Sequence, residues 1–221
     1  MKYLHNLVLH YYKNRDKSHG YSHVFDVYNI SKKITKKITK KITKKELIII
    51  KTSALFHDAW DNKYIKDKNE IIKIKKELRN DLKKINLNDK DIDDIYTIID
   101  NISFTKEYNL IKKNEKLELF DLTLLRDIVS DADKITSLGK VGVERIIIYE
   151  LSINKIKNIE LIIEKLKYLY KNRLEHILNN NYIKTEYGIK IAKEKFNEMK
   201  EIMNNEKLLY NIVNESINNE I

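Results

Sequence analysis

Apolar residues recur at three- and four-residue spacing along almost the whole chain. This period places them on one face of an α-helix, and short polar patches rather than Pro-Gly turns separate the segments. The pattern predicts helices at about residues 2–14, 21–43, 45–60, 67–84, 89–102, 117–150, 158–179 and 184–219. The sequence therefore predicts an all-α protein built as a bundle of helices.

The run from Leu47 to Leu55 carries one charged residue, Lys51, and is apolar around most of its circumference. A helix of this kind is stable when other helices surround it. We expect this segment to be the central helix of the bundle.

The composition supports one helical domain over residues 1–221. The length of 221 residues suits a single domain with a real core. Pro is absent and Gly occurs four times, which argues against a turn-rich β architecture. Gly139 and Gly142 indicate close packing of helices. The absence of Cys excludes disulfides, thiolate metal sites and Cys nucleophiles. We expect a cytoplasmic protein with no signal peptide and no membrane span.

The chain has 43 basic and 33 acidic residues, a formal net charge of +10. This excess attracts phosphates, in nucleotides and nucleic acids alike. Eight lysines lie in the Lys-rich KKIT insertion, residues 32–45, where KKIT occurs three times. Ile34, Ile38 and Ile42 are four apart, which predicts a solvated helical extension with a thin apolar stripe. The alternative is an arm that binds nucleic acid weakly.

Three segments place acids and histidines inside otherwise apolar helices, where an unpaired charge costs several kcal/mol. They are HGYSHVFDVYN with His19 and His23, SALFHDAWDNKY with His57, Asp58 and Asp61, and IVSDADKITSLGKVGVERI with Asp131, Asp133 and Lys134. Some partner must compensate these groups.

A divalent cation meets this requirement, because two neutral imidazoles and two carboxylates around it form a neutral site. Mixed nitrogen and oxygen ligands suit Mn, Fe, Co, Ni or Zn better than Ca. Open coordination positions could hold a water and a phosphate oxygen, as metal-assisted phosphoryl hydrolysis requires. His57 and Asp58 are about 100° apart on a helix, so both reach one ion only if the helix presents its end to the metal.

In this order, the three segments resemble the HD-domain phosphohydrolase superfamily, whose signature is H…HD…D and whose fold is an α-helical bundle with a metal site at its centre. The resemblance is narrowest to the small single-domain group that includes bacterial nucleotide pyrophosphohydrolases. It extends from about residue 15 to about residue 205, over SHGYSHVFDVYN, ALFHDAWDNKY, IIDNISF, VSDADKITSLGKVGVERI and TEYGIKIAKEKFNEM.

The resemblance implies specific roles for these positions. The implied metal ligands are His23, His57, Asp58 and Asp133, with Asp131 as an alternative ligand or a partner behind the ligands. Asp61 matches an acid that orients or deprotonates the attacking water. Implied phosphate contacts come from Lys134, which also stabilises charge in the transition state, and from Lys63, His19 and Arg145.

Three positions depart from the pattern of this group. Asp26 stands where the group has Arg, Lys134 replaces another Arg, and Thr136 replaces an Asp. The implied metal ligands are unaffected. The substrate contacts change, because Lys cannot reproduce the bidentate fork of Arg.

The resemblance implies an enzyme that depends on a divalent metal ion, Mn²⁺ in the first place and Mg²⁺, Co²⁺, Ni²⁺, Fe²⁺ or Zn²⁺ as alternatives. The expected reaction converts a nucleoside triphosphate, preferably a deoxy one, to monophosphate and pyrophosphate. Alternatives are an HD phosphodiesterase or a 5'-nucleotidase. An alternative of another class is a catalytically inactive HD-fold protein that binds nucleic acid. The sequence leaves the oligomeric state open, and a dimer is compatible with it.

Overall fold

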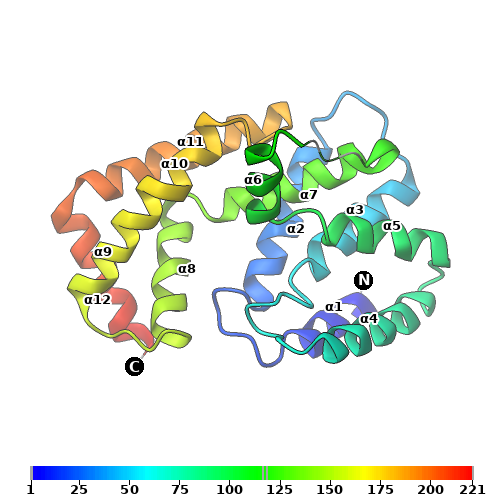
Figure 1. Cartoon of the computed structure of the whole chain (residues 1–221), viewed down its shortest axis with the longest axis horizontal. Helices are drawn as coiled ribbons and strands as arrows, with labels where there is room; N and C mark the ends of the chain where they lie inside the picture. The colour runs from blue at the N-terminus through cyan, green and yellow to red at the C-terminus, as the bar shows by residue number, and fades with distance from the viewer. Residues whose placement is uncertain (1, 116, 118, 221) are drawn as a thin grey trace.

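Helices follow one another along the chain with short connections (Figure 1). The computed structural model describes residues 2–115, 117 and 119–220, and this part of the chain contains no strand. The prediction of an all-α protein is confirmed. None of its helices is both long enough and apolar enough to span a bilayer. The α-helices are α1 (Lys2–Tyr11), α2 (Tyr21–Thr35), α3 (Lys44–Phe56), α4 (Lys68–Lys83), α5 (Asp89–Ile99), α6 (Phe104–Lys112), α7 (Thr123–Thr136), α8 (Gly139–Ser152), α9 (Ile159–Leu169), α10 (Glu175–Asn179), α11 (Glu186–Asn204) and α12 (Glu206–Glu220).

Side chains of the residues that precede several helices satisfy the first free backbone N–H groups. Thr43 accepts a hydrogen bond from the Glu46 backbone N–H at 3.2 Å, and the Glu46 carboxylate accepts one from the Thr43 N–H at 2.7 Å. This reciprocal capping box starts α3. The helices α4, α5 and α9 have a one-sided cap, in which a side-chain oxygen accepts a hydrogen bond from a backbone N–H of the first turn. The capping residues are Asp67, Asn88 and Asn158.

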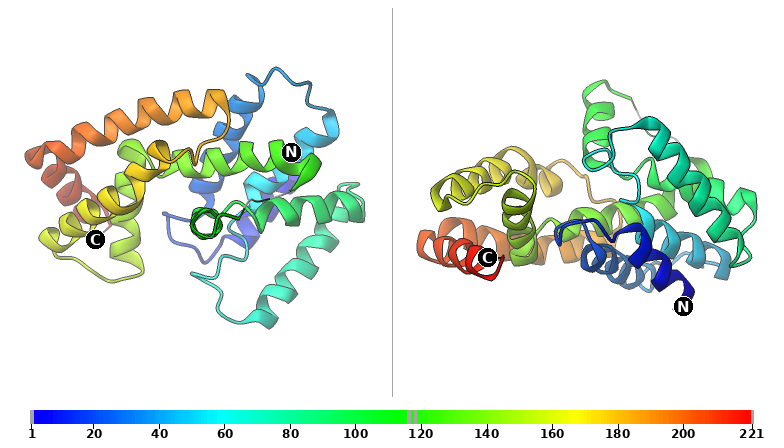
Figure 2. Two further views of the ribbon diagram at one scale, coloured as in Figure 1. Left: turned by 45° about the horizontal axis from the view of Figure 1, so that its top comes forward. Right: turned by 90° about the horizontal axis from the view of Figure 1, so that it is seen from below.

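The helix α7 connects two groups of helices. On one side it packs against α2, α3 and α5, and on the other against α8 and α11, while α8 also contacts α9 and α12. Figures 1 and 2 show the two groups side by side with α7 crossing between them. Any site that uses residues from both groups is therefore positioned by α7.

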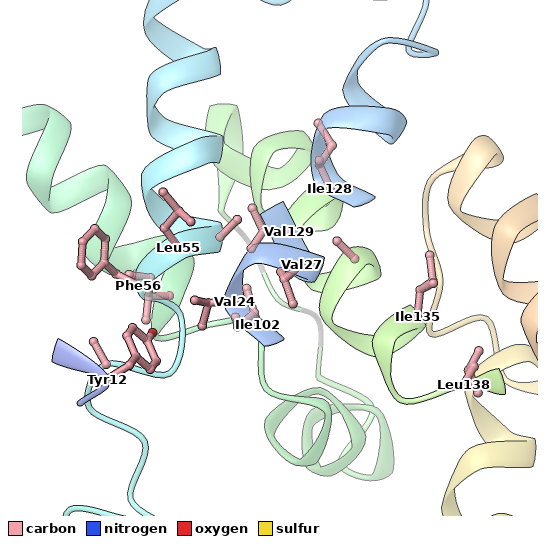
Figure 3. Packing of buried hydrophobic residues seen from close by; sticks show 14 of the residues in the cluster. Tyr12, Val24, Val27, Leu55, Phe56, Ile102, Ile128, Val129, Ile135 and Leu138 are labelled. Carbon is pink, nitrogen blue, oxygen red and sulfur yellow. The ribbon is translucent and has the colours of Figure 1, made fainter. Parts of the chain in front are cut away.

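The core of the first group lies where α2, α3 and α7 meet (Figure 3). Val24, Leu55 and Val129 come from these three helices and are buried. The helix α3 contacts α2, α5 and α7 and is buried along most of Ile49–Phe56. This C-terminal part of the helix is central in the bundle, as the apolar run predicts. Its N-terminal part does not agree, because Leu47 is 45% exposed.

The KKIT insertion is not a helical extension. The helix α2 ends at Thr35, and residues 36–43 form the connection that Figure 1 shows between α2 and α3. A continuous helix would place lysines four residues apart on the same face, where like charges repel. Ile34 is fully buried and Ile38 and Ile42 are half-buried against the core, so the isoleucines hold a loop instead of forming a stripe.

Two long helices predicted from the sequence are each divided in the structure. The segment predicted as 117–150 contains two helices, α7 and α8, and α8 starts at Gly139 with φ +72°, a conformation that favours glycine. Residues 184–219 form α11 and α12, which meet at Asn205. The helix α6 was not predicted at all.

The corner between α7 and α8 needs a residue without a side chain at position 142. A Cβ atom on Gly142 would lie 2.1 Å from the Ser137 carbonyl oxygen, much closer than van der Waals contact. The prediction of close packing at this glycine is confirmed.

We expect Gly142→Ala to lower the free energy of unfolding by about 1–3 kcal/mol, because the backbone must move to admit the methyl group. Urea unfolding measures the change. Val141→Ala is the matched control, since Val141 is 41% exposed on the same helix. A Gly142→Ala protein as stable as wild type would contradict this account of the corner.

A buried charge network ties α6 to α7. The Glu107 carboxylate accepts hydrogen bonds from Arg126 at 3.1 Å and from Lys134 at 2.6 Å, and Lys184 lies 3.1 Å from its other oxygen. The Lys134 ammonium also donates to the Ser130 hydroxyl and to a backbone carbonyl.

This network corrects the role expected for Lys134. Its three N–H donors are all used by protein acceptors, namely Glu107, Ser130 and the Tyr182 carbonyl. No donor is left for a phosphate, and the side chain is buried. Lys134 therefore holds α6 against α7 and does not grip a substrate.

We expect Glu107→Gln to lower the free energy of unfolding by about 3–5 kcal/mol, because Lys134 then stays buried without its ion-pair partner and Arg126 keeps only Asp127. The control is Glu77→Gln, which removes an exposed partner of Lys73 and should cost less than about 1 kcal/mol. Equal urea midpoints for the two variants would show that the network contributes no stability.

Candidate metal centre and its cavity

His57 and Asp58 lie where α3 ends. The helix stops at Phe56, and the Ala59 N–H closes a turn on the Phe56 carbonyl at 3.0 Å. Both side chains therefore project from the end of a buried helix, as their adjacency in the sequence requires. The turn after α3 is also held from outside, since Arg15 donates to the Asp58 and Ala59 carbonyls at 3.2 and 3.4 Å.

His23 reaches the same point from α2. It lies three residues into the helix, which begins after Gly20, and its side chain is buried. Its Nε2 atom is 3.0 Å from Nε2 of His57. Two imidazoles separated by 34 residues thus direct the same ring nitrogen at one another in the core.

Two carboxylates complete this group of four side chains, the candidate metal group, which consists of His23, His57, Asp58 and Asp133. Asp58 Oδ2 is 3.5 Å from His23 Nε2 and 3.3 Å from His57 Nε2. Asp133 Oδ1, from α7, is 3.5 and 3.6 Å from the same two nitrogens. The imidazoles are each 1% exposed, whereas the Asp58 and Asp133 side chains are 14% and 28% exposed. The carboxylates therefore form the open side of the group.

The donor atoms of this group fit a divalent cation. His57 Nδ1 donates to the Ala54 carbonyl at 2.8 Å, which leaves a lone pair on the Nε2 atom that faces His23. Asp58 Oδ2 is buried without a hydrogen-bond partner among the residues described. Neighbouring ligands at about 2.1 Å from one ion lie about 3 Å apart, as these atoms do. His23, His57 and Asp58 could hold a metal ion, and Asp133 lies beside them.

The charges in the group favour positive charge at its centre, on a protonated imidazole or on a bound cation. Burial alone would raise the pKa of Asp58, but His57 and His23 hold that pKa well below its ordinary value. The same two imidazoles lower the pKa of Asp133 against the effect of burial. Burial would lower the pKa of His57, but Asp58 and Asp133 raise it well above its ordinary value. Both acids are thus ionised, and they stabilise a positive charge at the two imidazoles between them, whether a proton or a bound cation carries it.

Asp131 faces away from this group. Two residues before Asp133 on a helix, it projects about 200° around the axis. Its carboxylate accepts hydrogen bonds from the Lys184 and Thr185 backbone N–H groups and from the Thr185 hydroxyl. Burial raises the pKa of Asp131 to about 6. Asp131 therefore holds the start of α11, and the structure does not bring it to the metal group as an alternative ligand.

Asp61 and Lys63 lie on the turn that follows Asp58. The Asp61 Oδ1 atom accepts the Lys63 backbone N–H at 2.7 Å, and its Oδ2 atom is 3.6 Å from Lys63 Nζ. The Asp61 N–H donates to the Asp58 carbonyl at 3.1 Å, which ties its position to that of the metal group. Asp61 and Lys63 line the same cavity as the metal group, so the structure brings them together with it.

His19 has a different role from the expected phosphate donor. The Ser18 hydroxyl donates to Asp16, so His19 Nδ1 must donate to the Ser18 oxygen at 2.7 Å. Its Nε2 atom then accepts from Lys63 Nζ at 3.4 Å. Burial lowers the pKa of His19 to about 3, which keeps the ring neutral. His19 thus holds Lys63 and has no N–H left to donate to a phosphate.

Arg145 reaches the group from α8. Its Nε atom donates to the Ser18 carbonyl and its Nη1 atom to the Thr136 hydroxyl, both at 2.8 Å. Burial lowers its pKa, while the carboxylates of Asp133, Asp58 and Asp26 raise it. Arg145 therefore faces the metal group with two of its donor atoms already fixed by the protein.

One cavity of about 1130 Å³ opens beside these residues. Its lining includes all four candidate ligands, Asp61 and Lys63 on one side, and α6, α8 and the segment between α9 and α10 on the others. Apolar and aromatic side chains line much of the remainder, among them Ile102, Phe104 and Tyr149. A cavity of this size and mixture is typical of a site for a small molecule with a charged end and an apolar end.

Sequence reasoning missed several residues of this site. Arg15 precedes the first motif and holds the turn at Asp58. Phe104 begins a helix that periodicity did not predict, and Arg173 lies in a π-helical turn, Tyr170–Leu174, that a 3.6-residue period cannot indicate. Of these residues, only Arg15 could have been found from the sequence, because it lies where the resemblance begins.

Comparison with known proteins shows the fold. No family model matches the chain, and no curated protein does. A protein of Lactobacillus plantarum is similar in structure, with a TM-score of 0.67 and 18% identity over 92% of each chain. Lin1889 of Listeria innocua gives a TM-score of 0.61 and 23% identity over 91% of this chain and 89% of its own. Bacillus subtilis YpgQ in complex with ADP gives 0.62 and 18% over 91% and 92%. The chain thus has the same helical fold as these bacterial proteins over nearly their whole length.

Proposed function

We propose that this protein is a metal-dependent nucleotide phosphohydrolase of the HD type. The observation that carries the proposal is the meeting of His23, His57, Asp58 and Asp133, from three helices, beside a large cavity. A structural role for so many buried ionisable groups is costly unless a cation compensates them.

The residues around the group have the chemistry that phosphoryl hydrolysis needs. A bound divalent ion would polarise a phosphate oxygen and lower the pKa of a bound water. The Asp61 carboxylate, which lines the same cavity, would orient that water and accept its proton. Lys63 and Arg145 supply positive charge for the phosphate oxygens, and His19 holds Lys63 in place.

A nucleotide is the substrate class that the cavity favours. The metal group and several cations line the cavity together with apolar and aromatic side chains, a mixture that suits the phosphates, sugar and base of a nucleotide. The similar fold of YpgQ, which was crystallised with ADP, supports a nucleotide as ligand. We propose cleavage of a nucleoside triphosphate, preferably deoxy, to monophosphate and pyrophosphate. Phosphodiesterase and 5'-nucleotidase activities use the same ligands and are the outcomes to compare.

We expect the wild-type protein to bind about one Mn²⁺ per chain and to gain thermal stability from it, since a ligand at 100 times its dissociation constant adds about 2.7 kcal/mol. His57→Ala and Asp58→Ala should lose both effects. Elemental analysis and thermal unfolding measure them. His10→Ala is the control, because His10 is exposed on α1. Retention of Mn²⁺ by both site variants would contradict the proposed ligand set.

We expect the Mn²⁺-loaded protein to release pyrophosphate from a panel of nucleoside triphosphates. Asp61→Asn should reduce kcat by about 10²–10⁴ while Mn²⁺ binding is kept, because proton acceptance and the ion pair with Lys63 are lost and no proposed metal ligand is changed. Glu70→Gln, an exposed acid on α4, should leave kcat unchanged. Product analysis separates pyrophosphate from phosphate release. An inactive wild type that binds DNA with steep salt dependence would instead favour the nucleic-acid-binding alternative.

A further inference from the structure

The cations that line the cavity differ in how many of their N–H donors are already bonded to other residues of the protein. Lys134 is saturated by the Glu107 network, and Lys63 is held between Asp61 and His19. Lys75 pairs with Asp100 at 2.8 Å. The remaining cavity cations are Lys106, which donates to Asn101 and the Asp100 carbonyl, Arg145, which is bonded through two nitrogens, Lys113 and Arg173.

Arg173 has no hydrogen bond and no ion pair within the part of the chain that the structure describes. Its guanidinium lies over the Phe104 ring, 5.1 Å from the ring centre. Phe104 is itself packed against Tyr182 at 4.8 Å between ring centres. The aromatic face therefore supports the guanidinium by a cation–π contact and leaves its five N–H donors free.

The backbone at Arg173 is irregular. Residues Tyr170–Leu174 form a π-helical turn between α9 and α10. Such single turns insert a residue into a helix, re-aim the neighbouring side chains and occur often at functional sites. Arg173 thus lines the cavity from the second group of helices, and the metal group at α2, α3 and α7 lines the same cavity.

The electrostatic surroundings point to an anion beside Arg173. Partial desolvation lowers the pKa of Arg173, which is still exposed to solvent, and the one opposing influence is the carboxylate of Asp133, a member of the metal group. An arginine with free donors is suited to bind the oxygens of a phosphate in bidentate fashion. A polyphosphate could contact the metal group with one phosphate and Arg173 with another, since both line the same cavity.

We infer that Arg173 binds a phosphate of the substrate that is not the one attacked, and so selects polyphosphates over monophosphates. This inference rests on the proposed function, since it names the chain of phosphates as the part of the nucleotide that Arg173 recognises. On this inference the substrate's phosphates are bound at two positions in the cavity, one at the metal group and the other at Arg173.

Binding of inorganic tripolyphosphate to the protein in EDTA, followed by isothermal titration calorimetry, tests the inference without turnover. Arg173→Gln should weaken binding by about ten- to a hundred-fold, the range of a hydrogen bond to a charged group. Arg173→Lys should fall between Arg173→Gln and wild type. Lys171→Gln is the matched control, because Lys171 is exposed on the same turn and does not line the cavity. It should bind tripolyphosphate as wild type does.

Steady-state kinetics with Mn²⁺ gives the second readout. Arg173→Gln should raise KM for a nucleoside triphosphate by a larger factor than KM for bis(p-nitrophenyl) phosphate, which has no second phosphate. Circular dichroism checks the fold of each variant. If Arg173→Gln unfolds, the affinity and kinetics of Arg173→Lys are compared with wild type instead. Equal tripolyphosphate affinity in wild type and the folded variants would overturn the inference, whatever the activity. A wild type that binds tripolyphosphate through Arg173 but hydrolyses nothing would overturn the proposed function alone.

Discussion

The contact on which the rest of the site depends is the one between the Nε2 atoms of His23 and His57, 3.0 Å apart in the core. A proton or a cation must lie between two nitrogens at this distance, because two bare lone pairs would repel one another. The hydrogen bond from His57 Nδ1 to Ala54 fixes the ring so that the lone pair faces inward, and Asp58 and Asp133 add negative charge on the open side. A divalent cation is the partner that satisfies all four groups at once.

The helix α7 fixes this geometry through residues that point in three directions. Asp133 faces the metal group, Asp131 caps the start of α11, and Lys134 joins Glu107 of α6. The candidate ligand Asp133, the second group of helices and the cavity wall that carries Phe104 are thus all attached to about one turn of α7. A shift of α7 would move the metal ligand and the cavity together.

The sequence predicted those parts of the site that depend on short-range pattern. An apolar run ending in His57 and Asp58 indicates a buried helix end, and the structure has it there. The choice between Asp131 and Asp133 stayed open, because a helical pattern shows that the two oppose one another and not which faces the histidines. Lys134 was misassigned since its partner, Glu107, lies on a helix that periodicity did not predict. Arg173 had no signal, because its π-helical turn interrupts the period on which the prediction relies.

The central claim is that four side chains from three helices surround a single cation. A crystal structure determined after soaking in Mn²⁺, with anomalous data collected above the manganese edge, tests it most directly. The account predicts one strong anomalous peak within about 2.0–2.3 Å of His23 Nε2, His57 Nε2 and a carboxylate oxygen each of Asp58 and Asp133. A map in which that position has no peak while the side chains stay as they are, or in which manganese binds elsewhere, would contradict it.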